Sequence, residues 1–423
     1  MNVLVIGGGG REHTLCWKLK QSKNCDTLYA APGNAGTANC AINLAIECND
    51  FEGIKEAVIS YNIRLVIVGP EEPLVNGIHD FFLNDNYLAK VGVIGPEKLA
   101  ATLEGSKAFA KEFMTRHNIP TAAYAEFTSE TILEGELFLE KNTSPYVLKA
   151  DGLAAGKGVL IIEDLETAKL ELRKMLLENK FGAASSKVVI EEFLEGIELS
   201  CFILTDGTSY LTLPMAKDYK RIGEGDKGLN TGGMGAVSPV PFVTEEFKEK
   251  IEKRIIKPTI EGLKKDRMPF KGFVFIGLIK VGEDPKVIEY NVRLGDPETE
   301  VVIPRIKNDL LALFQAVYQE RLGEITLEID SSTAATIVAV SEGYPEGYEK
   351  EKEISGLDQV KDKIIFHAGT IKKGNKVLTS GGRVLAVTSF GDEPKEAIRK
   401  SYETLNKISF EGINFRKDIG FDL

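Results

Sequence analysis

Short apolar runs that end in glycine alternate with helix-like stretches through the N-terminal part of the chain. The runs lie at residues 3–7, 27–33, 65–71 and 91–97, with the sequences VLVIG, TLYAAPG, LVIVGPE and VGVIGPE. Continuous apolar runs are typical of parallel strands that are buried on both faces. The pattern therefore predicts a small doubly wound α/β unit, with ligands bound just beyond the strand ends.

The pattern changes beyond the fourth run. Residues 98–118 are expected to be helical, and residues 120–200 mix strands with helix. A long glycine-rich polar stretch at 217–239 is predicted to be a loop. A helix near 244–265 precedes two strands, GFVFIGLIKV and KVIEYNVRL, and short strands dominate from about residue 328. We therefore predict a multidomain protein with an α/β unit, an α+β core and a small β-rich C-terminal part.

Length and composition are those of a globular protein. The 423 residues, of which 43% are hydrophobic and 27% charged, exceed one ordinary core, so about two to four domains are expected. No apolar run is as long as a membrane span. The N-terminal sequence MNVLVIGGGGREH lacks the basic start and cleavage site of a signal peptide. We expect a cytoplasmic protein that binds no membrane.

Charge and cysteine usage disfavour several kinds of site. A net charge of −11 disfavours nucleic acid, whose affinity depends on neutralising phosphates. The five cysteines include no CxxC pair and the four histidines are scattered, so neither a disulfide framework nor a zinc site is expected. A phosphate ligand would have to meet locally clustered lysines and arginines.

The stretch KADGLAAGKGV, at residues 149–159, has the glycines and lysines of a phosphate-binding loop. It is not a Walker A loop, because only three residues separate Gly152 from Gly156. In addition, Gly158 stands where that motif places Ser or Thr after its lysine. By itself the stretch is a weak candidate for phosphate binding.

A second glycine-rich loop, GGGGREH at residues 7–13, follows the first predicted strand. The dinucleotide fingerprint fails there, because its third glycine position falls on Glu12 and the second strand ends without an acidic residue for ribose. A glycine loop that opens a helix can still bind a phosphate, here with help from Arg11. A phosphate-bearing substrate and a structural turn both remain open.

The stretch KVIEYNVRLGDPETE, at residues 286–300, alternates polar and apolar residues. Because strand side chains alternate in direction, one face should carry the polar set and the other the apolar set. The polar set is Glu289, Asn291 and Arg293, and the apolar set is Ile288, Tyr290, Val292 and Leu294. A carboxylate and an amide oxygen are ligands that Mg²⁺ prefers, and Arg293 would bind a carboxylate beside the metal. A solvent-facing sheet surface explains the pattern equally well.

Three further stretches carry candidate residues. EEFLEGIELS, at 191–200, places two glutamates at a strand end and a third at Glu198, which solvated turn residues would also explain. Lys107, at the start of a helix that Ser106 can cap, is by itself more typical of a surface lysine. NTGGMGA, at 230–236, offers consecutive amides suited to an anion, or a plain mobile loop.

Together these stretches resemble one family over nearly the whole chain, the phosphoribosylamine–glycine ligases (glycinamide ribonucleotide synthetases), which are ATP-grasp enzymes of purine biosynthesis. The motifs that carry the resemblance are VLVIGGGGREH, APGNAGT, VGPEEPLVNGI, LEGSKAFAKEFM, IPTAAY, KADGLAAGKGV, EEFLEGIELS, NTGGMGAVSP, IEYNVRLGDPETE, FHAGT, TSGGRVL and RKDIG. The resemblance implies a pre-ATP-grasp domain with a doubly wound parallel sheet at 1–101 and a two-lobed ATP-grasp core at 102–327. It also implies a mobile ATP lid lobe at 120–192 inside that core, and a β-rich domain at 328–423.

The resemblance also implies a role for each candidate residue. ATP would lie between the two lobes, in contact with Lys107, Lys149, Gly152, Gly156, Lys157, Gly158, Glu191, Glu192, Phe193, Leu194 and Glu198. Mg²⁺ or Mn²⁺ would be held by Glu289 and Asn291, and the implied catalytic residues are Lys149, Arg293 and Asp296. Glycine and 5-phosphoribosylamine would contact Gly9, Gly10, Arg11, Glu12, Asn34, Gly36, Thr37, Asp218, Thr231, Gly232, Gly233, Met234, Gly235, Arg293 and Asp296.

The implied reaction has two steps. ATP first phosphorylates the carboxylate of glycine, and the amine of 5-phosphoribosylamine then displaces phosphate from glycyl phosphate. The alternatives are another ATP-grasp carboxylate–amine ligase or carboxylase and a non-catalytic nucleotide-binding module. A NAD-dependent dehydrogenase is disfavoured by Glu12. We expect a monomer or weak homodimer whose partners are these small molecules, with no nucleic acid and no membrane.

The chain departs from the family pattern in three separate stretches. The usual SQDHKR reads AKDYKR at 216–221, with Tyr219 in place of His, Leu229 replaces a proline, and Glu300 replaces a glutamine. We expect the reaction to be intact and the local roles of 217–221 and Glu300 to differ. The strand GFVFIGLI also lacks a carboxylate that many ATP-grasp enzymes carry, so phosphates and water would complete the metal shell.

Overall fold

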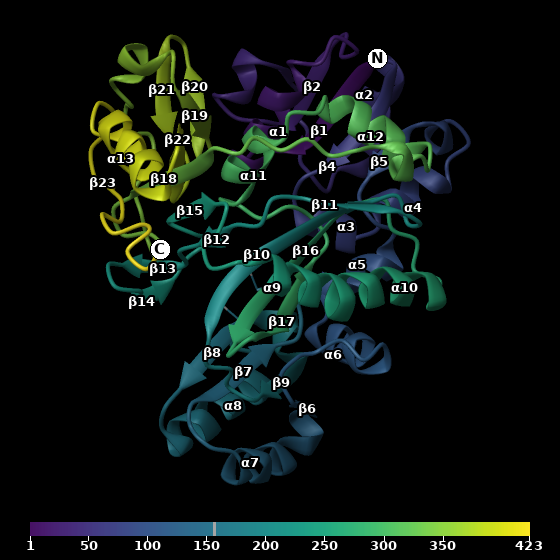
Figure 1. Ribbon diagram of the computed structural model, residues 1–423, viewed down its shortest axis with the longest axis vertical. Helices are drawn as coiled ribbons and strands as arrows, with labels where there is room; N and C mark the ends of the chain where they lie inside the picture. The colour runs from purple at the N-terminus through teal and green to yellow at the C-terminus, as the bar shows by residue number, and fades with distance from the viewer. Residues whose placement is uncertain (155–157) are drawn as a thin grey trace.

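A five-stranded parallel sheet forms the N-terminal part of the computed structural model, which describes residues 1–154 and 158–423 (Figure 1). The strands are hydrogen-bonded in the order β3-β2-β1-β4-β5, which is that of a doubly wound sheet. Their bounds are β1 (Asn2–Gly7), β2 (Leu28–Pro32), β3 (Ile42–Asn43), β4 (Ile63–Val68) and β5 (Gly92–Ile94). The four predicted strands are confirmed. The two-residue β3 was not predicted, because it is exposed and contains a single apolar residue.

Both faces of this sheet are covered, as its continuous apolar runs predict. Leu4 and Ile6 face α2 (Phe51–Ser60), α3 (Glu71–Val75) and α4 (Ile78–Leu83). Val3 and Val5 face α1 (Gly10–Leu19) and α12 (Leu310–Tyr318). Since α12 comes from much later in the chain, one face of the N-terminal sheet is covered partly by a helix from outside the N-terminal region.

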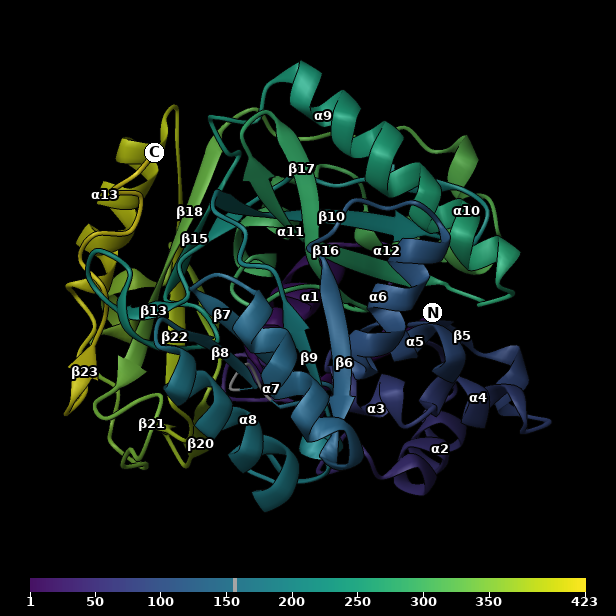
Figure 2. The same ribbon diagram turned by 90° about the horizontal axis from the view of Figure 1, so that it is seen from below.

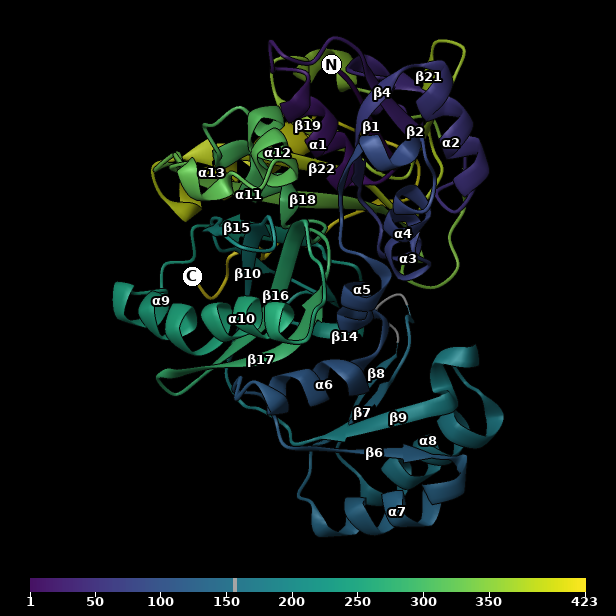
Figure 3. The ribbon, with the colours of Figure 1, turned by 90° about the vertical axis from the view of Figure 1, so that its right-hand side faces the viewer.

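A separate lobe lies at the end of the molecule away from the N-terminal sheet (Figures 1 and 3). Its antiparallel sheet has the order β6-β9-β7-β8, and α7 (Ile132–Lys141) and α8 (Leu165–Glu178) pack against it. The strands are β6 (Tyr124–Thr128), β7 (Tyr146–Ala150), β8 (Val159–Ile162) and β9 (Lys187–Glu191). The helical prediction for 98–118 resolves into α5 (Lys98–Gly105) and α6 (Lys107–Arg116), which precede the lobe. Ser106 caps α6 as predicted, because its Oγ accepts a hydrogen bond from the Phe109 amide at 3.1 Å.

The central antiparallel sheet has the order β11-β10-β16-β17. Its strands are β10 (Ile197–Thr205), β11 (Tyr210–Thr212), β16 (Gly272–Val281) and β17 (Asp284–Asn291). A continuous helical segment of α9 (Glu245–Ile251), a π-helical turn (Glu252–Ile256) and α10 (Lys257–Lys265) packs against one face (Figure 2). On the other face, Phe202 and Phe273 pack against α11 (Thr299–Arg305) and α12.

The C-terminal sheet has the order β12-β15-β18-β22-β19, and α13 (Pro394–Leu405) packs on it. Its strands are β12 (Lys217–Asp218), β15 (Gly235–Ser238), β18 (Thr333–Ser341), β19 (Ile364–His367) and β22 (Arg383–Gly391). The loop prediction for 217–239 is therefore wrong. That stretch contains β12, β13 (Arg221–Gly223), β14 (Lys227–Asn230) and β15, and β15 pairs with β18 from much later in the chain.

Candidate active site

The predicted polar face of β17 lies on the side of the central sheet that faces away from α9 and α10. Val287 and Tyr290 of β17 pack into the core beneath those helices. Glu289 and Asn291 point to the opposite side, and Glu289 lies across from Gly277 of β16. Because Gly277 has no side chain, the space beside the Glu289 carboxylate is left open. The predicted grouping of Glu289 with Asn291 on one face is confirmed.

The alternation predicted for the rest of this stretch is wrong at Ile288 and beyond Asn291. Strand β17 ends at Asn291, so Arg293 lies in the turn beyond it and not on the strand face. A β-bulge leaves Ile288 without a pairing partner on β16, which breaks the period of two. The bulge lies beside the site, and Lys149 Nζ is 3.4 Å from the Ile288 carbonyl oxygen.

Three lysines from separate segments surround Glu289. Lys107 begins α6, Lys149 lies in β7 and Lys220 follows β12. Burial alone would raise the pKa of Glu289, but the charges of Lys220, Lys149 and Lys107 lower it below its usual value. Burial also lowers the pKa of Lys107, and Glu289 opposes that shift. This local excess of positive charge around one carboxylate is what a polyphosphate with a divalent cation requires.

Asp151 ties the start of the glycine-rich loop to α6. Its carboxylate accepts hydrogen bonds from the Ala108 amide at 2.7 Å and from Ser106 Oγ at 3.0 Å. Its carbonyl oxygen accepts one from the Lys107 amide at 3.1 Å, and Lys107 Nζ donates to the Gly152 carbonyl at 3.3 Å. The N-terminus of α6 therefore fixes the point where β7 leaves the sheet of the separate lobe.

The strand end predicted to bind adenine is held by a buried ion-pair cluster. The Glu191 carboxylate lies 3.0 Å from Lys111 Nζ and 2.9 Å from Lys149 Nζ, and all three side chains are almost completely buried. Residues 192–194 follow outside regular structure. Because its carboxylate faces inward, Glu191 offers a ligand its backbone. Two of the predicted ATP contacts, Gly156 and Lys157, lie outside the described residues.

Glu198 and Asp218, both predicted ligand contacts, meet at Lys220. Lys220 Nζ lies 3.0 Å from Glu198 Oε2 and 4.0 Å from Asp218 Oδ2. Lys220 lowers the pKa of Glu198, whereas burial raises the pKa of Asp218. Lys220 was not among the site residues predicted from the sequence. The feature that could have identified Lys220 is its position two residues after Asp218, because side chains two residues apart in an extended segment point to the same side.

Arg293 is enclosed by two carboxylates that were not predicted as site residues. Its Nη2 lies 2.8 Å from Glu104 Oε1, and its Nε lies 3.2 Å from Glu71 Oε2. Nη2 also donates to Asn291 Oδ1 at 3.3 Å. Burial raises the pKa of Glu104 to about 7, although Arg293 opposes the shift. Glu71 and Glu104 belong to α3 and α5, so only the folded chain brings them beside β17.

Asp296 lies between α1 and the C-terminal domain. Its Oδ2 accepts a hydrogen bond from the Arg11 amide at 3.2 Å, and its Oδ1 lies 3.0 Å from Arg383 Nη1. The Leu294 carbonyl oxygen accepts from Arg11 Nη1 at 3.0 Å and from Arg293 Nη1 at 3.1 Å. Arg293 and Asp296, the two predicted catalytic residues of this turn, are therefore linked through the Leu294 carbonyl and Arg11, although their side chains contact different partners.

Glu12 fills the crevice between the ends of β1 and β4. Its carboxylate accepts a hydrogen bond from the Gly9 amide at 2.6 Å and pairs with Arg11 Nε at 2.6 Å. A Cβ at Gly69, directly after β4, would collide with this carboxylate. A negative group at the point where the strand order reverses opposes a bound pyrophosphate, in agreement with the failed dinucleotide fingerprint.

The APGNAGT turn joins the N-terminal sheet to the C-terminal domain. Asn34 Nδ2 donates to the Gly8 carbonyl at 2.9 Å and to the His367 carbonyl at 2.7 Å. Asn34 Oδ1 accepts from the amides of Gly36 and Thr37 at 2.8 and 2.9 Å. The Asn34 side chain thus has an evident structural role at this domain junction.

The NTGGMGA stretch is anchored to its surroundings. Thr231 Oγ1 donates to the Lys220 carbonyl at 2.7 Å, and Met234 is fully buried in the C-terminal core. Gly233 has a φ of +119°, where a side chain would be strained and would also collide with Pro297. These contacts favour a fixed wall of a site over a plain mobile loop.

Two of the departures from the family pattern are buried. Tyr219 is 1% exposed, its hydroxyl donates to Asp422 Oδ1 at 2.8 Å, and Arg416 lies over its ring. Glu300 is fully buried, and within the described part of the chain neither of its side-chain oxygens has a hydrogen-bond partner. Burial raises the pKa of Glu300 well above its usual value. Tyr219 therefore docks the C-terminal tail, whereas Glu300 lies inside the site region.

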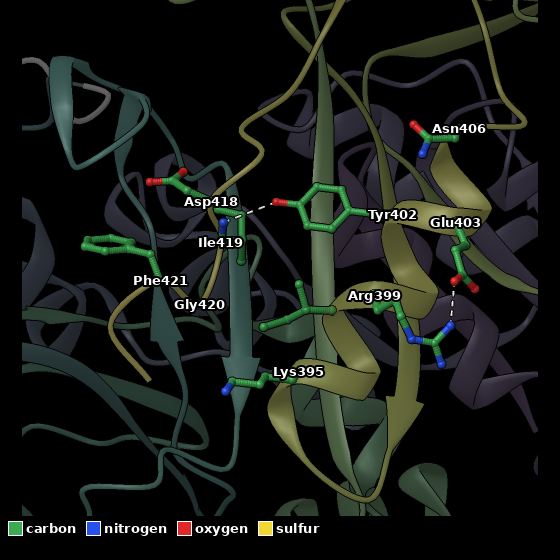
Figure 4. A pocket seen from close by; sticks show the side chains of 10 residues that line it. Lys395, Arg399, Tyr402, Glu403, Asn406, Asp418, Ile419, Gly420 and Phe421 are labelled. Atoms are coloured by element: carbon green, nitrogen blue, oxygen red, sulfur yellow. Dashed lines mark hydrogen bonds and ion pairs between the residues drawn. The ribbon is translucent and has the colours of Figure 1, made fainter.

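A shallow cleft of about 420 Å³ lies elsewhere, between α13 and the C-terminal tail (Figure 4). Ile398, Tyr402 and Phe421 line it together with charged residues of α13. It contains none of the predicted site residues.

The helices that the structure describes, in residues 1–154 and 158–423, include none with the length and apolar character of a membrane span.

Comparison with known proteins covers most of the chain. Residues 1–104, 105–299 and 334–422 match the N domain, the ATP-grasp (A) domain and the C domain of phosphoribosylglycinamide synthetase. The chain is 45% identical over 429 residues to the phosphoribosylamine–glycine ligase of Vibrio vulnificus strain YJ016, covering 100% of this chain and 98% of that relative. It is 44% identical to the bifunctional purine biosynthetic protein PUR2,5 of Pichia angusta over 99% of this chain, but spans only 53% of that protein.

Comparison with solved structures gives the same fold. The crystal structure of the phosphoribosylamine–glycine ligase of Thermotoga maritima has a TM-score of 0.86 and 35% identity, covering 99% of this chain and 100% of that one. The biotin carboxylase domain of Hydrogenobacter thermophilus 2-oxoglutarate carboxylase, solved with MgADP, ADP and bicarbonate, shares the fold with a TM-score of 0.74 at 15% identity, over 98% of this chain and 91% of that one. The predicted fold class is confirmed, and the chain belongs to the phosphoribosylglycinamide synthetase family, with an ATP-grasp domain at its centre.

Proposed function

We propose that this protein is a phosphoribosylamine–glycine ligase, which joins glycine to 5-phosphoribosylamine and converts ATP to ADP and phosphate. The observation that carries the proposal is the cluster of Lys107, Lys149 and Lys220 around Glu289. Lys149 comes from β7 of the separate lobe, Lys107 from α6 just before that lobe, and Lys220 from the segment after β12. Closure of the lobe at 120–192 would therefore enclose a polyphosphate between them. The family membership supports the choice of substrates.

Glu289 and Asn291 would hold Mg²⁺ or Mn²⁺. The residues fit such an ion, because two oxygen-bearing side chains share one strand face, and Asn291 Oδ1, which accepts from Arg293 Nη2 at 3.3 Å, keeps a second lone pair for a cation. Across residues 1–154 and 158–423, no group of three His, Cys, Asp or Glu side chains could hold a metal alone. Phosphate oxygens and water would therefore complete the shell. The ion would supply charge neutralisation at the transferred phosphate.

The remaining residues position and neutralise the reactants. Arg293 would orient the glycine carboxylate, which attacks the γ-phosphorus of ATP and releases ADP, giving glycyl phosphate. Lys149 would stabilise negative charge on the transferred phosphate. The amine of 5-phosphoribosylamine then attacks the activated carbonyl carbon, expels phosphate and loses a proton, giving glycinamide ribonucleotide. No nucleophilic side chain is required.

The other ligand contacts follow from the same arrangement. The backbone of 191–194 would meet adenine, since the Glu191 carboxylate is turned inward, and Glu198 would meet ribose. Asp296 would hold the glycine amine. The α1 start and the NTGGMGA wall would receive 5-phosphoribosylamine. Because glycyl phosphate and 5-phosphoribosylamine are both labile, enclosure by the lid would also protect them from water.

The test is an assay of ADP release with ATP, glycine and freshly prepared 5-phosphoribosylamine. We expect ADP release to require both glycine and 5-phosphoribosylamine, with formation of the amide product. ADP release that instead requires bicarbonate or another amine acceptor would identify a different ATP-grasp enzyme. Nucleotide binding without ADP release under any of these conditions would identify a non-catalytic module.

A further inference from the structure

Arg383, the first residue of β22 in the C-terminal domain, reaches two loops of the candidate site. Its Nη1 lies 3.0 Å from Asp296 Oδ1 and 2.7 Å from the Asp296 carbonyl oxygen. The same nitrogen donates to the Gly232 carbonyl at 2.6 Å. One guanidinium therefore joins the turn after β17 to the NTGGMGA wall, and its side chain is only 21% exposed.

The glycines of NTGGMGA allow this close approach. A Cβ at Gly232 would lie 2.8 Å from Arg383 Cζ, so any side chain there would displace the guanidinium. Gly233, with its φ of +119°, packs against Pro297, the residue directly after Asp296. The loop sequence is thus matched to the position of Arg383 as well as to the turn that carries Asp296.

The charges around Asp296 require a cation. Asp296 Oδ2 and the carboxyl group of Glu300 both pack against Gly10 at the start of α1. Burial would lower the pKa of Arg383, but Asp296, Tyr344 and Glu300 outweigh this and raise it. Without Arg383, the Asp296 carboxylate would keep the Arg11 amide as donor while lying beside a second carboxyl group. Loss of the guanidinium would therefore change where the carboxylate points.

We propose that Arg383 is a positioning residue of the ligation reaction, which holds the Asp296 carboxylate in the direction of the glycine amine. The inference rests on the proposed function, in which Asp296 binds that amine. It gives the C-terminal domain a direct part in the active site. A carboxylate fixed by a guanidinium on one oxygen and a backbone amide on the other is preorganised for a cationic ligand.

The test compares the steady-state constants of Arg383→Gln and Arg383→Lys with those of the unmodified protein. We expect Arg383→Gln to raise the KM for glycine about tenfold or more, since a charge-assisted contact is lost. The KM for ATP should stay within about twofold, because Arg383 contacts none of the predicted ATP-binding residues that the structure describes. Arg383→Lys should recover part of the loss in glycine binding.

Arg416→Gln is the matched control, because Arg416 is also a buried arginine of the C-terminal domain and pairs with Asp226 and Asp418. It should lower the melting temperature without changing the ratio of the two KM values. If Arg383→Gln changes both KM values equally or neither, the positioning role is rejected. If that variant does not fold, Arg383→Lys must show the selective rise in the glycine KM, and its absence rejects the role. An unmodified protein that fails to use glycine would instead reject the proposed function.

Discussion

The ammonium group of Lys149 lies 2.9 Å from the carboxylate of Glu191, and both side chains are almost completely buried. Lys149 is in β7 and Glu191 ends β9, so the pair joins two strands of the separate lobe that lead into the predicted ATP contacts. Glu191 has a second cation, Lys111 of α6, at 3.0 Å. Lys149 can therefore turn toward a phosphate without leaving Glu191 unpaired.

Replacing each of the two lysines should affect a different property, activity for Lys149 and stability for Lys111. Lys149→Met is expected to lower kcat about 100-fold or more, because it removes a cation from the transferred phosphate. Its effect on the free energy of unfolding should be small, since Lys111 still pairs with Glu191. Lys149 likewise still pairs with Glu191 in Lys111→Met, but Thr121 Oγ1 and the Ala122 carbonyl then lose a buried donor, so this variant should be less stable than Lys149→Met by about 1–3 kcal/mol.

Urea unfolding and ADP release measure the two effects on the same preparations. Lys174→Met on α8 is the control, because this lysine is partly exposed and pairs with Glu171, one turn earlier in the same helix. Full activity of Lys149→Met would contradict its placement at the phosphate. A large loss of stability in that variant would show that Lys149, and not Lys111, is the structural partner of Glu191.

Glu289→Gln tests the metal position with little change in shape. Removing the charge should lower kcat at saturating ATP about 100-fold or more, and raising the Mg²⁺ concentration should not restore it. The fold should survive, because Glu289 lies off the core face of β17. Glu283→Gln, in the exposed turn between β16 and β17, is the matched control and should retain activity. An active Glu289→Gln variant would overturn the assignment.

The part of the site that the sequence predicts depends on local periodicity. Alternation along β17 placed Glu289 with Asn291, and apolar runs located the parallel strands, because both patterns follow from backbone geometry within one segment. Alternation failed at Ile288 and Arg293, since a bulge and a strand end depend on pairing with β16. The family resemblance added roles for residues that no local pattern selects.

Long-range contacts explain why several site residues and short strands were not predicted from the sequence. Glu71, Glu104 and Arg383 reach the site from α3, α5 and β22. They lie in the family motifs VGPEEPLVNGI, LEGSKAFAKEFM and TSGGRVL, but no local periodicity places their side chains beside β17. The short strands within 217–239 were also missed, because β15 is fixed by pairing with β18 and not by an apolar run of its own. Such residues become evident only when separate segments are brought together.

Tyr219→Phe tests the structural role assigned to the 217–221 stretch. The variant loses the hydrogen bond from the Tyr219 hydroxyl to Asp422 and should destabilise the protein by about 1 kcal/mol. Its kcat and KM values should be unchanged, because the hydroxyl faces the C-terminal tail. Tyr87→Phe, at a 39% exposed tyrosine of the N-terminal domain, should affect neither property. A rise in KM for any substrate would instead place Tyr219 in the binding machinery.

Ionisation of Glu298 should lower the free energy of unfolding as the pH rises from 4.5 to about 7. It is 3% exposed and accepts a hydrogen bond from Ser200 Oγ at 3.0 Å. Burial, reinforced by the charge of Asp218, raises the pKa of Glu298 from 4.5 to about 7. Below pH 4.5 the group is protonated in both the folded and the unfolded chain, so it contributes no difference there. Above that pH the unfolded chain ionises first, which favours unfolding until the folded group also ionises near pH 7.

Glu298→Gln removes this titration while keeping an oxygen that can accept from Ser200. The free energy of unfolding of the variant, relative to the unmodified protein, should therefore increase between pH 4.5 and 7 and level off above pH 7. The full increase should be about 3 kcal/mol at most, and urea unfolding across this pH range measures it. Glu134→Gln, at an exposed position of α7, should show no such trend. A difference for Glu298→Gln that is constant with pH would mean that the carboxyl group is already ionised in the folded protein, held so by Lys220.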